Sequence, residues 1–326
     1  MKPFRYERAD DERSAVAVLA GTPGARFLGG GTNLVDLMRL GVETPDVLVD
    51  VTRLPANRVD VMPDGGLLIG AGVRNSDLAW DGRVRRDYGV LSRALLSGAT
   101  GQLRNRATTA GNLLQRTRCA YFQDVSSPCN KREPGTGCPA IEGDHRNLAV
   151  LGHSDACVAT HPSDMAVALV AFDAVVRVIG PAGARAIPLA DFHRLPGETP
   201  HLDTVLRRDE LVVAVELPPS DSAARSTYRK VRERASFSFA VVSVAAALDV
   251  RDGRIDDVRI ALGGVSHKPW RARVAEDALR GESADGATFD RAARAELAQA
   301  HPLRDNAYKV GLAHATLVRT LTELAG

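Results

Sequence analysis

The chain has 326 residues, of which 44% are hydrophobic and 25% are charged, and its formal net charge is +2. This composition is typical of a globular protein with a substantial core, and the length favours two domains. The near-neutral charge and the lack of any apolar run of roughly 18 residues argue against nucleic acid or a membrane as a partner.

Short strands and helices are predicted through the first two thirds of the chain. Apolar residues at helical spacing predict helices over Leu34–Leu40, Tyr88–Ser97 and 163–172, the last with Ser163 as its N-cap. Strands are predicted at Arg26–Leu28, Asp46–Val51, Gly66–Gly70, Ala174–Ile179 and Leu211–Leu217.

A domain boundary is predicted at Pro218–Ala224, where two prolines precede small polar residues. Beyond it, an antiparallel sheet is expected from the strands Thr227–Val231, Ala240–Val250 and Asp257–Gly263. Helices are predicted at Arg271–Leu279, Phe289–Ala300 and Asn306–Ala325. This carboxy-terminal part is therefore expected to be a small sheet with helices, an α+β arrangement.

All the cysteines of the chain fall in one segment, at Cys119, Cys129, Cys138 and Cys157. This confinement predicts that the four thiols converge on one object. The pattern C-x9-C-x8-C-x18-C lacks the short C-x-x-C pair that structural zinc sites usually contain, whereas a long wrapping loop can hold an iron–sulfur cluster. The pattern favours a cluster, and zinc or disulfides stay open as alternatives.

The residues between the cysteines fit a wrapping loop. A regular helix or central strand is prevented there by Pro128, Pro134, Gly135, Gly137 and Pro139. The negative charge of a cluster would be offset by Arg116, Arg118, Lys131, Arg132 and Arg146. The polar stretch Met1–Glu12 indicates that the chain has no export signal of its own, and reducing compartments disfavour disulfides.

Two turns rich in glycine and hydroxyl groups could hold a dinucleotide. Gly29–Asn33 (GGGTN) lies between a predicted strand and a predicted helix, where backbone N–H groups favour a pyrophosphate. It is neither G-x-G-x-x-G nor a Walker A motif, and a glycine turn without a ligand is the alternative reading. Thr108–Asn112 (TTAGN) is a second such loop, so the two together could clamp both phosphates.

These turns and the triplet Pro162–Asp164 (PSD) resemble the FAD-binding subunit of molybdenum hydroxylases, the family of xanthine dehydrogenase, carbon monoxide dehydrogenase and bacterial aldehyde oxidoreductases. The likeness extends to LGGVSHKPWR at 262–271. Three further segments resemble the medium subunit of the periplasmic aldehyde oxidoreductases, which carries a [4Fe–4S] cluster in such a loop. They are QRTRC at 115–119, PCNKR at 128–132 and ATHPSDM at 159–165.

The resemblance implies an α+β fold in two domains. Residues 1–218 would form a two-lobed FAD-binding domain of the vanillyl-alcohol-oxidase/CO-dehydrogenase flavoprotein type, with lobes at about 1–55 and 56–218 and an iron–sulfur loop at about 115–158. Residues 219–326 would form the CO-dehydrogenase-flavoprotein-like C-terminal domain, with a small three-stranded antiparallel sheet and helices.

The same resemblance implies the residues that bind cofactors. The pyrophosphate and adenosine side of FAD would contact Arg26, Phe27, Leu28, Gly29, Gly30, Gly31, Thr32, Asn33 and Leu34. The second loop would contribute Thr108, Gly111 and Asn112, and the flavin half would meet Ala99, Asp164, Val212 and Lys230. The cluster ligands would be Cys119, Cys129, Cys138 and Cys157. FAD is expected to be non-covalent, and a side chain at Gly30 to block the approach of the backbone to the pyrophosphate.

One position departs from the family pattern. Animal xanthine dehydrogenases place an aromatic side chain on the flavin just before the second loop, where this chain has Ser97, Gly98 and Ala99. The expected electron acceptor is therefore oxygen, a quinone or a small redox protein, and not NAD.

The function that the resemblance implies is electron transfer within a heterotrimer. An aldehyde would be oxidised at a molybdenum cofactor on a large partner subunit, so no catalytic residue is expected in this chain. Electrons would reach FAD through the [2Fe–2S] clusters of a small partner and leave to an external acceptor. Cofactors would be assembled in the cytoplasm, and the complex exported to the periplasm by a partner's signal. The alternatives are a self-sufficient FAD-dependent oxidoreductase and a zinc-stabilised, non-enzymatic interaction module.

Overall fold

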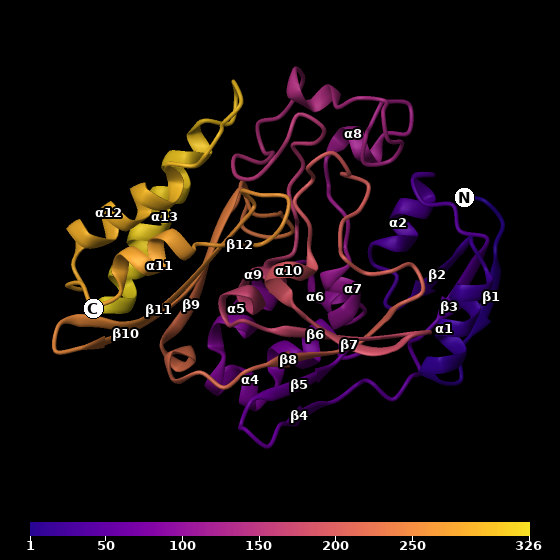
Figure 1. The fold of residues 1–326 in the computed structure, drawn as a ribbon, viewed down its shortest axis with the longest axis horizontal. Coiled ribbons are helices and arrows are strands. Elements are labelled where there is room, and N and C mark those ends of the chain that lie inside the picture. The colour runs from indigo at the N-terminus through magenta and orange to yellow at the C-terminus, as the bar shows by residue number, and fades with distance from the viewer.

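Three sheets follow one another in the computed structural model, which describes residues 1–326. Figure 1 shows a small N-terminal lobe at one end, a central sheet with helices, and the C-terminal sheet and helices at the other end. The two termini lie in the two outer parts. None of the helices combines the length and the apolar character that crossing a bilayer demands.

The N-terminal lobe is a parallel sheet of β1 (Arg5–Arg8), β3 (Val47–Asp50) and β2 (Ala25–Leu28), in that order. The central strand β3 is buried at every residue, which explains its almost wholly apolar sequence. Helix α1 (Glu12–Gly21) packs Ala15, Val16 and Leu19 against this sheet. Helix α2 (Leu34–Arg39) follows β2 directly after the first glycine turn.

The central sheet has five antiparallel strands, in the order β4 (Val59–Val61), β5 (Leu67–Gly70), β8 (Leu211–Leu217), β6 (Val175–Gly180) and β7 (Gly183–Pro188). Strand β8 has the bounds that its sequence predicts. The short helices that connect this region are α3 (Asn75–Trp80), α4 (Gly82–Asp87), α5 (Gly89–Ser97), α6 (Gly101–Arg104), α7 (Thr109–Leu113) and α10 (Leu189–Phe192).

The C-terminal sheet has four antiparallel strands, in the order β12 (Trp270–Arg271), β11 (Arg254–Gly263), β10 (Val242–Arg251) and β9 (Ser226–Val231). The prediction of three strands is therefore wrong by one. Strand β12 has only two residues, too few to show an alternating pattern, and only its pairing with β11 reveals it. The remaining elements are η2 (Asp221–Arg225), α11 (Arg273–Leu279), α12 (Gly286–Leu297) and α13 (Tyr308–Ala325).

Helix α9 (Asp164–Ala171) packs between α5 and strands β10 and β11. Every residue of α9 is buried, because the helix is apolar on all sides after its first residue. Ser163 caps it as predicted, since its hydroxyl accepts a hydrogen bond from the backbone N–H of Ala166 at 2.9 Å. The helix thus carries Asp164 at its start into the interior.

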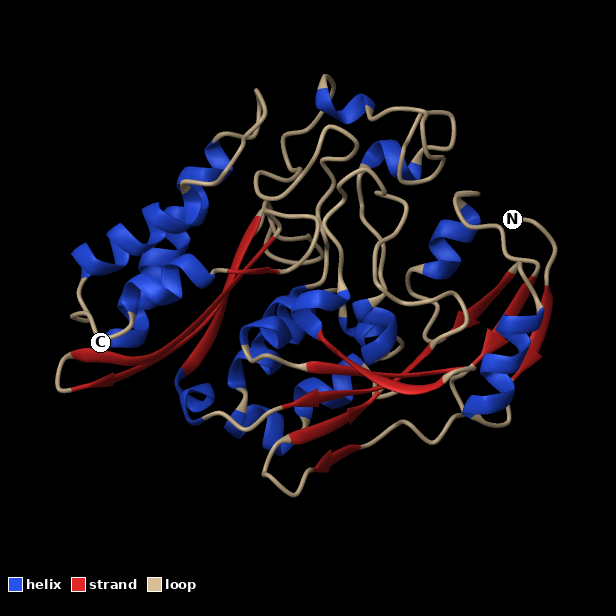
Figure 2. Cartoon of the chain, in the orientation of Figure 1, coloured by secondary structure: helices blue, strands red, loops and turns tan.

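The cysteine loop, residues 115–158, is largely irregular (Figure 2). It contains only the short helices α8 (Ala120–Gln123) and η1 (Pro139–Ile141). The four cysteines pack in a small separate core with Leu37, Phe122 and Leu148 among others. The loop therefore has its own apolar centre, beside α2 of the N-terminal lobe.

Lys309 ties α13 to the cysteine loop. Its side chain is fully buried, and its Nζ donates to the carbonyl oxygens of Asn147, Leu148 and Gly264 at 3.0, 2.8 and 2.6 Å. Burial lowers the pKa of Lys309 to about 7, because the charged form loses its hydration.

The substitution Lys309→Met is expected to change how stability depends on pH. The folded state releases this proton near pH 7, whereas the unfolded chain keeps it up to about 10.4. Between these values the unfolded state binds more protons, so the free energy of unfolding rises with pH, by at most about 1.4 kcal/mol per pH unit. Denaturant unfolding at several pH values above neutrality should show this rise in the unsubstituted protein and a smaller one in the variant. Parallel profiles would contradict the assignment.

Candidate functional site

The first glycine turn, Gly29–Asn33, joins β2 to α2 and packs closely against another part of the chain. Gly31 has φ of +76°, a conformation that glycine adopts without strain. A Cβ at Gly30 would lie 1.9 Å from the carbonyl oxygen of Arg106. The missing side chain of Gly30 faces the backbone of 106–107, so the close packing of these two segments is a further reason for glycine at this position.

The second turn, Thr108–Asn112, lies against the first. Thr108 caps α7, since its Oγ1 accepts from the backbone N–H of Gly111 at 3.2 Å. The same Oγ1 lies 3.0 Å from the place a Cβ would take at Gly29. The two turns are therefore neighbours in space, although they are about eighty residues apart in sequence.

Two adjoining cavities lie at these turns. The first has a volume of about 330 Å³ and the second about 570 Å³, and Thr32, Asn33 and Gly111 line both. The predicted residues that line only the first are Arg26, Phe27, Gly29, Gly30, Gly31, Leu34, Thr108 and Val212. Those that line only the second are Ala99, Asn112, Asp164 and Lys230. Leu28 lines neither cavity.

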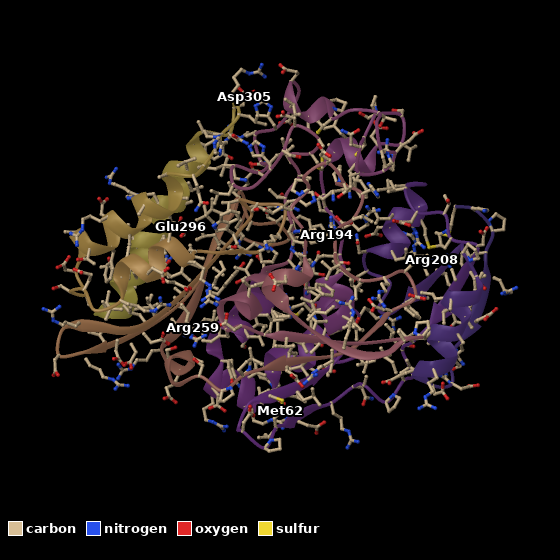
Figure 3. The ribbon with its side chains drawn as sticks, viewed as in Figure 1. Met62, Arg194, Arg208, Arg259, Glu296 and Asp305 are labelled. Carbon is tan, nitrogen blue, oxygen red and sulfur yellow. The ribbon has the colours of Figure 1, made fainter.

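The predicted cofactor residues thus divide into two groups that share a boundary at the turns. An elongated ligand with two unlike halves fits such an arrangement. The first cavity also receives residues that no motif indicated, from the segment before β8. Among them, Arg208 donates from Nη2 to the carbonyl oxygen of Leu19 at 2.8 Å and so reaches the N-terminal lobe (Figure 3).

An ion pair between Asp164 and Lys230 lies in the wall of the second cavity. Lys230 Nζ is 2.7 Å from Asp164 Oδ2, and both side chains are nearly inaccessible to solvent. Lys230 also donates to the carbonyl oxygen of Ser97 at 3.1 Å. Tyr228 donates its hydroxyl to Asp164 Oδ1 at 2.6 Å, and burial next to this carboxylate raises the pKa of Tyr228 well above its usual value. The phenol therefore stays protonated, and the carboxylate is held from two sides.

A group of amide side chains lies beside this ion pair. Asn112 Nδ2 donates to Asn75 Oδ1 at 2.7 Å, and Ser163 Oγ donates to Asn112 Oδ1 at 2.5 Å. Asn75 is buried, lines the second cavity and has no protein partner for its Nδ2. A buried donor without a partner is costly unless a ligand accepts from it. Sequence reasoning missed Asn75, because it is a single amide outside any motif.

The second cavity has aromatic lining from an unexpected segment. The loop that contains Ala99 contributes no aromatic residue to this cavity. Phe237 and Phe239, from the connection between β9 and β10, line it instead. Both phenylalanines are about half exposed, at 56% and 48%. Arg118 of the cysteine loop stacks on Phe239, with its guanidinium carbon 5.0 Å from the ring centroid. The run ASFSFA, with two aromatic residues among small ones, was the available signal.

The cysteines converge as their confinement predicts. Cys119, Cys129, Cys138 and Cys157 all line one small pocket, and none forms a disulfide. No three cysteine, histidine or acidic side chains are grouped closely enough to hold a single metal ion.

The loop around this pocket is held by basic side chains. Arg132 donates from Nη1 to the carbonyl oxygens of Tyr121 and Phe122, both at 2.8 Å, and Arg116 stacks on the Phe122 ring at 4.6 Å. Cys119 lines both this pocket and the second cavity. The pocket of thiols and the two-part cavity are therefore neighbours.

Two family models match the chain in succession. Residues 2–220 match the FAD binding domain in molybdopterin dehydrogenase, and residues 219–324 match the CO dehydrogenase flavoprotein C-terminal domain. Together with the fold and the two-part cavity, they define an FAD-binding oxidoreductase subunit. The chain belongs to the family of FAD-binding medium subunits of molybdenum hydroxylases.

Particular relatives are similar over nearly the whole length. The aldehyde oxidoreductase FAD-binding subunit PaoB of Escherichia coli K12 is 55% identical over 99% of this chain and 98% of its own. The glyceraldehyde dehydrogenase medium chain of Sulfolobus acidocaldarius is 27% identical over 86% of this chain and 82% of its own. In fold, the chain resembles a structure of carbon monoxide dehydrogenase from Hydrogenophaga pseudoflava, with a TM-score of 0.77 and 24% identity over 98% of this chain and 97% of that one.

Proposed function

We propose that this chain carries FAD and a [4Fe–4S] cluster and transfers electrons within a heterotrimeric molybdenum aldehyde oxidoreductase. The position of Cys119 carries this proposal, because this residue lines both the pocket of thiols and the second cavity. Groups bound in these two places would be neighbours. The substrate class is supported by the E. coli relative, which is named an aldehyde oxidoreductase subunit.

The two-part cavity fits FAD. The adenosine and pyrophosphate side would lie in the first cavity against Arg26, Phe27 and the residues Gly29–Leu34, and the flavin side in the second with Asp164 and Lys230. The free Nδ2 of buried Asn75 supports a bound ligand here. FAD supplies exchange of one or two electrons. The chain's own contribution is to hold Lys230 in place through Asp164 and to keep Tyr228 protonated.

The residue types of the pocket of thiols suit a cluster. Cys119, Cys129, Cys138 and Cys157 would be the ligands, in apolar surroundings that limit solvent access. The spacing of the four cysteines, which lacks a C-x-x-C pair, suits a cluster better than zinc.

The proposed partners are a large subunit with the molybdenum cofactor and a small subunit with [2Fe–2S] clusters. Relatives from S. acidocaldarius and H. pseudoflava are named medium chains, which supports companions of other sizes. We propose a division into domains at residues 218 and 219, assembly of cofactors in the cytoplasm, and a periplasmic location reached with a partner. The acceptor is proposed to be a molecule other than NAD, because Ser97, Gly98 and Ala99 offer no aromatic ring just before the second turn, and the rings that line the second cavity, Phe237 and Phe239, come from a different segment.

The purified chain tests this function. We expect it to contain iron, inorganic sulfide and FAD that acid releases, and to show overlapping flavin and iron–sulfur absorption. Without partners it should not reduce a dye with an aldehyde, whereas the complete complex should. Stoichiometric zinc without sulfide would contradict the proposed cluster. Flavin that resists release by acid would contradict non-covalent binding. Aldehyde-dependent dye reduction by the chain alone would contradict its role as an electron-transfer subunit.

A further inference from the structure

Lys131 is a buried cation in the wall of the pocket of thiols. Its side chain is 1% exposed, and it lines the pocket together with the four cysteines. Its Nζ donates to the carbonyl oxygen of Pro200 at 2.7 Å and to Asp203 Oδ1 at 2.5 Å. It also contacts His267 Nε2 at 2.8 Å. Three partners from two other segments therefore hold the ammonium in one position.

The ammonium lies beside the segment that carries Cys157. His267, which contacts Lys131 Nζ, also bonds through Nδ1 to the carbonyl oxygen of Ala159 at 3.1 Å. The neighbouring Asn130 donates its side-chain amide to the carbonyl oxygen of Ala156 at 3.0 Å. These two contacts hold residues 130–131 along 156–159, and Lys131 and Cys157 line the same pocket.

Asp203 is shared between two cations. Its Oδ1 bonds to Lys131, and its Oδ2 accepts from Arg116 Nε at 2.8 Å. Arg116 also pairs with Glu43 at 2.7 Å, on the side of the first cavity. His267 is neutral, because burial and the nearby Lys131 lower its pKa to about 3. Lys131 is therefore the cation that this network places on the side of the thiols, with Asp203 partly offsetting its charge.

We propose that Lys131 is a positioning residue that sets the reduction potential of the group bound by the four cysteines. This inference rests on the proposed [4Fe–4S] cluster. Reduction adds one electron to the cluster, and no bond forms or breaks. The electron comes from the flavin in the complex, or from dithionite in a titration. A fixed positive charge in a site with little solvent stabilises the more negative, reduced form and raises the potential.

Redox titration of the cluster, followed by electron paramagnetic resonance in the assembled complex, tests this inference. Lys131→Met should lower the potential of the cluster, Lys131→Arg should keep it close to the unsubstituted value, and Asp203→Asn should raise it by removing the offsetting charge. Arg146→Met is the matched control: Arg146 was expected from the sequence to offset the charge of the cluster, but it is exposed and does not line the pocket of thiols. Its loss should change the potential little, because water and salt screen an exposed charge.

An unchanged potential in an iron-loaded Lys131→Met variant, or equal shifts in the Lys131 and Arg146 variants, would overturn the role of Lys131. If Lys131→Met fails to fold, Asp203→Asn decides, because it keeps the lysine, and a potential that does not rise would overturn the role. Absence of iron and sulfide from the unsubstituted protein is a different outcome. It would overturn the proposed cluster, and this inference with it.

Discussion

Gly30→Val is expected to abolish FAD binding by separating the two turns that form the cavities. A Cβ at Gly30 would lie 1.9 Å from the carbonyl oxygen of Arg106 and 3.1 Å from the Cα of Ala107. Both contacts are with backbone, so no side chain can rotate away, and we expect a destabilisation of about 3 kcal/mol, at the upper end of the usual range for overpacking. FAD content after gel filtration should fall at least about tenfold if even half of this cost opposes binding.

Gly101→Ala is the matched control for this substitution. Gly101 begins α6, beside the second cavity, and a Cβ there would meet no atom within 4 Å. This variant should keep its FAD and its thermal stability. Full flavin content in Gly30→Val would contradict the pairing of the turns, and equal losses in both variants would show that the region tolerates no added methyl group.

Cys129→Ser is expected to remove the iron and to loosen the cysteine loop. Cys129 is 7% exposed, and its backbone N–H donates to Thr136 Oγ1 at 3.0 Å. Serine is a poor cluster ligand, and binding of a metal centre is coupled to folding of the loop around it. Iron and sulfide content should fall to near zero, visible absorption should reduce to that of flavin, and limited proteolysis should cut within residues 115–158.

Ser126→Ala provides the comparison within the same loop. Ser126 is exposed, and its hydroxyl bonds only to Asp124, at 2.7 Å. Iron, sulfide and resistance to proteolysis should therefore stay at the unsubstituted level. Retention of full iron and sulfide by Cys129→Ser would show that this thiol is not a ligand, and the assignment of the four cysteines would fail.

Local patterns in the sequence determined many elements of the fold. Strand β8 has its predicted bounds, and Ser163 caps α9 as expected, because alternation and capping depend on residues close together in the chain. Helix α1 was missed although its signal was present: Asp11 and Ser14 form a capping box before Ala15 and Val16. Strand β1 is polar and mostly exposed, and strand β7 has Ile187 as its one large apolar residue, so neither showed an apolar pattern.

For the site, the sequence by itself determined the motifs that could contribute to it: the turns Gly29–Asn33 and Thr108–Asn112, the triplet Pro162–Asp164 and the four cysteines confined to one loop. Only the tertiary structure decided which of them meet. It placed Gly30 against Arg106, brought Phe237 and Phe239 to the second cavity, and joined Lys131 to Arg116 through Asp203. The reason is physical: these contacts join residues far apart in the chain, and their free energy depends on burial and charge that exist only after folding.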